Sequence, residues 1–127
     1  MLIKIDPILS PDVLHCLRSM GHGDKLILCD SNFPAYSLNK RVYRIDGVNA
    51  SRAAEAILSV FPLDSFIEYP ILKMEIDGKP NELNDVHKEL IDTTKKVSGD
   101  HWKIGSIERN NFYKETKNAY AIITTNE

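Results

Sequence analysis

A histidine flanked by glycines stands close in the chain to an aspartate, and together they could transfer protons. His22 lies between Gly21 and Gly23, and Asp30 follows the run Lys25-Leu26-Ile27-Leu28-Cys29. That run is short and almost entirely apolar, which predicts a strand covered on both faces. Asp30 would stand at the carboxyl end of this strand, where ligands gather in open α/β sheets. The flanking glycines would let a substrate approach closely, so the sequence indicates a candidate acid/base site for a small molecule.

A simpler interpretation of His22 is a histidine at a helix end that bonds the last carbonyl groups of the helix. The other three histidines, His15, His87 and His101, are most simply surface or helix-packing residues. Their spacing lacks the i, i+4 pairs and the cysteine partners of a metal site, so no metal is expected. The glycine pair at 21 and 23 follows a predicted helix, whereas nucleotide-binding loops follow a strand. A nucleotide cofactor is therefore not expected either.

The composition is that of an ordinary globular chain. It has 127 residues, a net charge of −2, 43% hydrophobic residues and 27% charged residues. This length suits one domain with its own core, and the charge gives no reason to expect nucleic acid or an anionic membrane as a partner. No apolar run could span a bilayer, and the first residues lack the form of a signal peptide. Cys16 and Cys29 are expected to be buried free thiols, which favours the cytoplasm.

Predicted strands alternate with predicted helices around this site. The first helix is expected to begin at Ser10-Pro11-Asp12 and to end at Gly21, a residue that tolerates positive φ. A loop is expected from residue 31 to about residue 40. The other expected helices are 50–61, about 81–97 and 109–118, and the expected strands are 25–29, 42–45, 66–76, 104–108 and 120–125. The alternation predicts an α/β fold, which we expect to be a three-layer α/β/α sandwich around a mixed sheet, in a single domain over residues 1–127.

The stretch LSPDVLHCLRSMGHGDKLILCDSNFPAYS resembles the amino-terminal signature of the L-fucose mutarotase / D-ribose pyranase family. The resemblance continues through residues 61–64, 71–74, 108–109 and 112–113, and so covers essentially the whole chain. Asn32-Phe33-Pro34 together with Arg109 favours the fucose branch. The resemblance implies an isomerase that interconverts the α and β anomers of a free sugar without a cofactor. It also implies a ring-shaped homo-oligomer, often a decamer, with pockets at the subunit contacts.

The same resemblance implies roles for individual residues. His22 would be the general acid and base, and the remaining residues would bind the sugar: Asp30 and Arg109 through its hydroxyl groups, Asp64 and Tyr113 by further polar contacts, and Met74 as an apolar wall. Opening the sugar ring requires one group to protonate the ring oxygen and another to accept the anomeric hydroxyl proton. A histidine, with an unperturbed pKa of about 6.5, can do either near neutrality.

Two features depart from the family pattern. Asn110-Asn111 stands where the family has a more apolar pair. The family also continues into a Tyr-x-Asn segment and a final strand, whereas this sequence stops at Asn126-Glu127. We expect that segment to be either omitted or disordered, and its loss to weaken sugar binding by about 1–3 kcal/mol. The alternatives are a D-ribose pyranase and a sugar-binding protein without catalytic activity.

Overall fold

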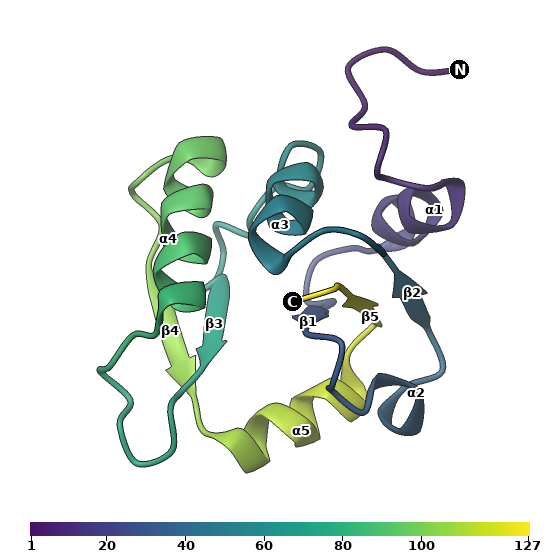
Figure 1. The fold of residues 1–127 in the computed structure, drawn as a ribbon. Helices are drawn as coiled ribbons and strands as arrows, with labels where there is room; N and C mark the ends of the chain where they lie inside the picture. The colour runs from purple at the N-terminus through teal and green to yellow at the C-terminus, as the bar shows by residue number, and fades with distance from the viewer.

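The computed structural model describes residues 1–127, which form two parallel β-sheets surrounded by helices (Figure 1). In chain order the elements are α1 (Pro11–Ser19), β1 (Leu26–Cys29), α2 (Ala35–Leu38), β2 (Val42–Arg44), α3 (Ala50–Leu58), β3 (Ile71–Met74), α4 (Asp85–Ser98), β4 (Ile104–Ile107), α5 (Arg109–Asn118) and β5 (Ala121–Thr124). The larger sheet has the order β1-β5-β2 and the smaller sheet consists of β3 and β4. The α/β class predicted from the sequence is confirmed.

Helices cover both faces of the larger sheet. Successive side chains of its central strand β5 point to opposite faces, and each face packs against a different pair of helices. Ile123 belongs to a core cluster that includes Val13 of α1 and Ile57 of α3. Ile122 belongs to a second cluster with Ala35 of α2 and the partly buried Phe112 of α5. The three expected layers are therefore α1 and α3, the sheet, and α2 and α5.

Side-chain caps explain where three of the helices begin. The hydroxyl of Ser10 accepts a hydrogen bond from the Val13 amide at 3.2 Å, and Asn49 caps α3 in the same way. The carboxylate of Glu108 accepts from the first amides of α5, those of Asn110 at 2.9 Å and Asn111 at 3.1 Å. This negative group beside the helix N-terminus also explains why α5 tolerates a cation, Arg109, as its first residue.

The expectation of a mixed sheet is wrong, because β1 and β2 both run parallel to β5, and β3 runs parallel to β4. The only antiparallel pairing is an isolated bridge between Ile76 and Lys79 in the turn after β3. Apolar runs predict where strands lie, but their periodicity is the same for parallel and antiparallel neighbours. Strand direction here is decided by the helices that connect the strands.

Several element boundaries also differ from expectation. Helix α1 ends at Ser19 with an extended Met20 as its cap, and the positive φ of 87° belongs to Gly23 and not to Gly21. The expected strand at 66–76 is reduced to Ile71–Met74, because Pro70 cannot donate a ladder hydrogen bond and the preceding segment is exposed. The expected loop at 31–40 contains the short helix α2, which starts directly after a proline and buries Ala35. Helices α3 and α4 are shorter than predicted, by about one turn in each case.

The two cysteines are buried and free, as predicted. Burial, and then the negative charge of Asp30, raises the pKa of Cys29 to about 12, so this thiol stays protonated and inert. Its Sγ lies 3.7 Å from the carbonyl oxygen of Ile123, to which it donates. None of the helices is long and apolar enough to cross a membrane.

Candidate functional site

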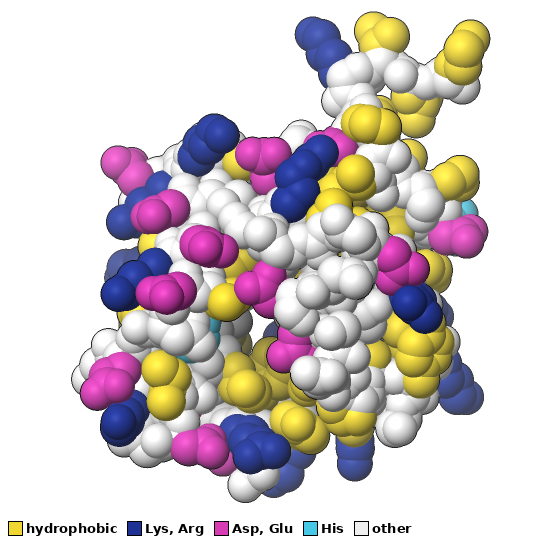
Figure 2. All heavy atoms as spheres, viewed as in Figure 1, with side chains coloured by type: hydrophobic (Ala, Val, Ile, Leu, Met, Phe, Trp, Pro, Cys, Tyr) yellow, Lys and Arg dark blue, Asp and Glu magenta, His cyan; other side chains and the backbone are white.

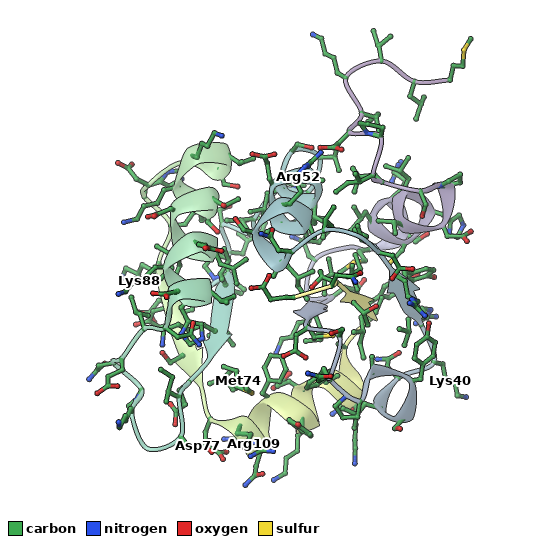
Figure 3. The ribbon with its side chains drawn as sticks, viewed as in Figure 1. Lys40, Arg52, Met74, Asp77, Lys88 and Arg109 are labelled. Atoms are coloured by element: carbon green, nitrogen blue, oxygen red, sulfur yellow. The ribbon has the colours of Figure 1, made fainter.

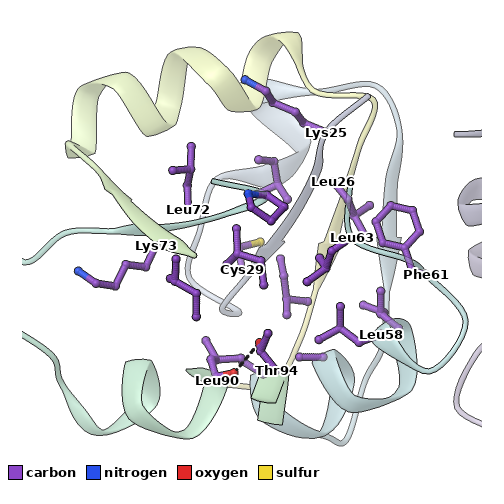
Figure 4. Close-up of a pocket in the computed structure, with 18 of the residues that line it drawn as sticks. Lys25, Leu26, Cys29, Leu58, Phe61, Leu63, Leu72, Lys73, Leu90 and Thr94 are labelled. Carbon is purple, nitrogen blue, oxygen red and sulfur yellow. Dashed lines mark hydrogen bonds between the residues drawn. The ribbon is translucent and has the colours of Figure 1, made fainter. Parts of the chain in front are cut away.

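An apolar cleft of about 1080 Å³ separates the two sheets. All four residues of β1 and all four of β3 line it, and each strand has one edge without a partner because β1 pairs only with β5 and β3 only with β4. Figure 1 shows that β1 and β3 lie apart, and Figure 2 shows the molecular surface hollowed between the two halves. Side chains of α3 and α4 also line it, among them Leu58, Leu90 and Thr94 (Figure 4).

His22 is placed at the rim of this cleft by a tight turn. The amide of Gly21 donates to Oδ2 of Asp24 at 2.9 Å, and the amide of Asp24 donates back to the carbonyl of Gly21 at 3.1 Å. Gly23 supplies the left-handed backbone conformation that closes the turn. The His22 side chain remains 77% exposed, with its ring edge-on to Phe66 at a centroid distance of 5.1 Å. Asp24 is thus a turn residue, and the turn presents His22 to solvent.

Asp64 orients the His22 ring. Its Oδ2 lies 3.3 Å from Nδ1 of His22, and its Oδ1 accepts from the backbone amide of Phe66 at 2.9 Å. These contacts, the Phe66 amide first and His22 after it, lower the pKa of Asp64, which stays ionised at neutral pH. Because an ionised carboxylate can only accept, Nδ1 carries the proton and Nε2 is left free. The family resemblance implies a polar contact of Asp64 with the sugar, and in the structure its carboxylate contacts His22.

A second, smaller cavity of about 390 Å³ adjoins the cleft. Four of the predicted site residues line it: Asp30, Met74, Arg109 and Tyr113. Figure 3 shows Met74, at the end of β3, near Arg109, at the start of α5. The guanidinium of Arg109 lies 5.8 Å from the centre of the Tyr113 ring, and its Nη1 lies 3.8 Å from Oδ2 of Asp77. Both partners of the latter pair are exposed, so it contributes little stability and leaves the guanidinium available.

The six predicted residues therefore form two groups. His22 and Asp64 line the large cleft, while Arg109 and Tyr113 line only the small cavity. Asp30 and Met74 line both spaces and connect them. The Asp30 carboxylate is oriented by the backbone that follows it, because its Oδ1 accepts a hydrogen bond from the amide of Asn32 at 3.0 Å.

One residue that borders both spaces was not expected there. His87, in the first turn of α4, lines the cleft and the small cavity, although the sequence suggested only a surface or packing role. The local sequence signal is Asn84 three positions before it, since the two side chains form a reciprocal capping box. Glutamate or glutamine usually occupies the third helical residue of a capping box, so a histidine at that position is easily overlooked.

Comparison with known proteins shows to which family the chain belongs. The family model described as the RbsD / FucU transport protein family matches residues 3–127. The chain belongs to this family. It is 38% identical over 129 residues to an L-fucose mutarotase of Actinobacillus pleuropneumoniae serotype 5b (strain L20), covering 100% of this chain and 88% of the relative.

Solved structures of family members have the same fold. A fucose mutarotase from Streptococcus pneumoniae, crystallised in complex with L-fucose, is 33% identical with a TM-score of 0.89, covering 99% of this chain and 89% of that one. FucU from Bifidobacterium longum is 38% identical with a TM-score of 0.86, covering 97% and 88% of the two chains. The resemblance inferred from the His22 and Asp30 region is thus confirmed over the whole chain.

Proposed function

We propose that this protein is a single-domain isomerase that interconverts the α and β anomers of L-fucose. The observation that carries the proposal is the Asp64–His22 pair, 3.3 Å apart at the rim of the cleft, in a chain whose relatives are named L-fucose mutarotases. An oriented imidazole with one free nitrogen is the group that proton transfer to and from a sugar requires.

In the proposed reaction, Nε2 of His22 accepts the proton of the anomeric hydroxyl. The bond between C1 and the ring oxygen then breaks, C1 becomes an aldehyde carbon, and a solvent water molecule at this exposed rim gives a proton to the ring oxygen, which becomes a hydroxyl group. The aldehyde turns about its bond to the next carbon, and ring closure on its other face gives the second anomer. In the closing step the attacking hydroxyl group returns its proton to solvent, and His22 gives its proton to the carbonyl oxygen, which becomes the new anomeric hydroxyl group. Asp64 stabilises the imidazolium that forms in between. The reaction needs proton transfers but no change of oxidation state, so its chemistry requires no cofactor.

The sugar-binding roles are distributed over the small cavity. Arg109 and Asp30 supply a charged donor and a charged acceptor for sugar hydroxyl groups, and Tyr113 supplies a phenolic hydroxyl. Met74 offers an apolar wall, which suits the methyl group of fucose. Since Asp30 and Met74 reach both spaces, a sugar held by them would lie between Arg109 and the rim that carries His22.

Exchange NMR on the anomeric protons tests the activity and the choice of sugar together. We expect the protein at catalytic concentration to accelerate exchange between the α and β signals of L-fucose well above the rate in buffer. D-ribose measured under the same conditions distinguishes the alternative, because a D-ribose pyranase would accelerate ribose more than fucose. Equal, buffer-like rates for both sugars would contradict the proposal.

We further propose that the chain forms a large ring-shaped homo-oligomer, such as a decamer, in the cytoplasm. Phe66, Ile67, Tyr69 and Leu72 beside the cleft are exposed, and so is Tyr36. Phe33 and Phe112, in contrast, are partly buried and pack against the core cluster of Ile122. Exposed apolar side chains gathered in this way mark protein contacts, and a closed ring repeats one contact around its axis.

Light scattering tests the assembly directly. We expect one discrete species several times heavier than the 14.4 kDa chain. Replacing Phe66, which is 80% exposed, by serine is expected to shift the mass distribution toward smaller species. A wild-type protein that remains a monomer at micromolar concentration would contradict both the assembly and pockets shared between subunits.

A further inference from the structure

Phe33 connects the turn that carries Asp30 to the side chain of Tyr113. The Phe33 ring meets the Tyr113 ring at a centroid distance of 5.1 Å and an interplanar angle of 66°, and it meets the Phe112 ring at 5.5 Å and 79°. Both contacts are edge-to-face, so that the positive edge of one ring lies against the negative face of the other. Phe33 and Phe112 both pack against the core cluster of Ile122. The Phe33 ring therefore links Tyr113 to the core.

Two consecutive turns fix the backbone of Phe33. Its amide donates to the carbonyl of Asp30 at 3.4 Å, and its carbonyl accepts from the amide of Ala35 at 2.8 Å. Pro34 between them has φ −77° and ψ 59°, the values of an inverse γ-turn, and its own ring restricts that φ. The first of these turns also orients the Asp30 carboxylate, which accepts from the amide of Asn32. One turn thus places the carboxylate of Asp30 and the ring of Phe33 together.

The three aromatic rings follow the division between the two spaces. Phe112 lines only the large cleft, Tyr113 lines only the small cavity, and Phe33 lines both. The Tyr113 ring also has the Arg109 guanidinium 5.8 Å from its centre, but the Arg109 side chain is exposed. An exposed cation constrains a ring weakly. The contact with Phe33, whose backbone is fixed and whose ring packs against the core, is therefore the stronger constraint on Tyr113.

We propose that Phe33 is a positioning residue for sugar binding, which sets the orientation of the Tyr113 ring relative to Asp30 by edge-to-face packing. The inference rests on the proposed function, in which Tyr113 supplies a phenolic hydroxyl and Asp30 a carboxylate to the same sugar. Phe33 has no group that transfers protons. Its loss should therefore raise KM and leave the chemical step, carried by His22 at the rim of the cleft, almost unchanged.

A double-mutant cycle in the full chain tests this coupling. Phe33→Leu removes the ring and keeps an apolar side chain, and we expect KM for L-fucose to rise about three- to tenfold, with kcat within about twofold of wild type. In the background of Tyr113→Leu, which itself raises KM, Phe33→Leu should add less than about a twofold rise, because the side chain that it positions is gone. Tyr120→Leu removes a partly buried tyrosine that lines neither space, and this matched control should keep KM near the wild-type value.

The NMR signals of the Tyr113 ring give a readout that does not depend on activity. Because they feel the ring current of Phe33, they should shift in Phe33→Leu and stay near their wild-type positions in Tyr120→Leu. A titration with L-fucose followed by these signals measures Kd, which Phe33→Leu should raise by the same factor as KM. A wild-type protein that binds fucose without accelerating its exchange would refute the proposed function, and the change in Kd would still test this inference.

If Phe33→Leu does not fold, Phe33→Met replaces it, because methionine fills a similar volume without a ring, and KM should again rise. A folded Phe33→Leu or Phe33→Met protein with wild-type KM and Kd would overturn the proposal. An equal rise of KM with and without the Tyr113 side chain would overturn it as well, because Phe33 would then act independently of Tyr113.

Discussion

Replacing His22 by alanine is expected to reduce catalysed anomer exchange of L-fucose by about 10²–10⁴-fold, the usual contribution of one positioned acid/base group. The fold should be unaffected, because the side chain is 77% exposed in a turn and its polar contact is with Asp64. Exchange NMR on the anomeric protons measures the loss, and circular dichroism and light scattering establish that the variant is folded and assembled as wild type.

His15→Ala is the matched control for this substitution. His15 is an exposed histidine of α1 that lines neither the cleft nor the small cavity. We expect this variant to exchange fucose anomers at the wild-type rate. A folded His22→Ala protein with undiminished exchange would remove His22 from the mechanism, and with it the role given to Asp64.

The second large effect is on stability. Ile123 of β5 is fully buried, with 0% exposure, in the cluster shared with α1 and α3. Ile123→Ala would leave a cavity in the middle of the sheet, and we expect it to lower the free energy of unfolding by about 3 kcal/mol. Urea unfolding should report a lower midpoint with an unchanged slope.

An isoleucine outside the core provides the comparison. Ile3, near the N-terminus, is 87% exposed, and Ile3→Ala should change the unfolding free energy by less than about 0.5 kcal/mol. A similar effect of the two substitutions would mean that β5 is not the centre of the core.

Local features of the structure could be predicted from the sequence because they depend on neighbouring residues. Ser10 and Asn49 cap their helices through side-chain oxygens, and the helix over Arg109–Asn118 has the predicted bounds. The order and direction of the strands could not be predicted in the same way. Ala121–Thr124, last in the chain, lies at the centre of the larger sheet, and nothing within this strand indicates which neighbours it has.

The site shows the same division between local and long-range information. The turn that carries His22 follows from the glycines and Asp24 beside it, but the pairing with Asp64 joins residues far apart in the chain. His87 was missed because its position depends on how α4 packs beside β3. Family resemblance identified the six predicted residues, and only the structure shows that they form two groups connected through Asp30 and Met74.

The central claim is that the protein catalyses anomer exchange, and polarimetry on freshly dissolved single-anomer L-fucose tests it most directly. The optical rotation should approach the same final value with and without protein, with a rate constant that rises linearly with protein concentration while sugar remains in large excess. A sugar-binding protein without activity would leave the rate at its value in buffer, or would change the final rotation only in proportion to the protein added. Either of these results, obtained with folded and assembled protein, would contradict the account.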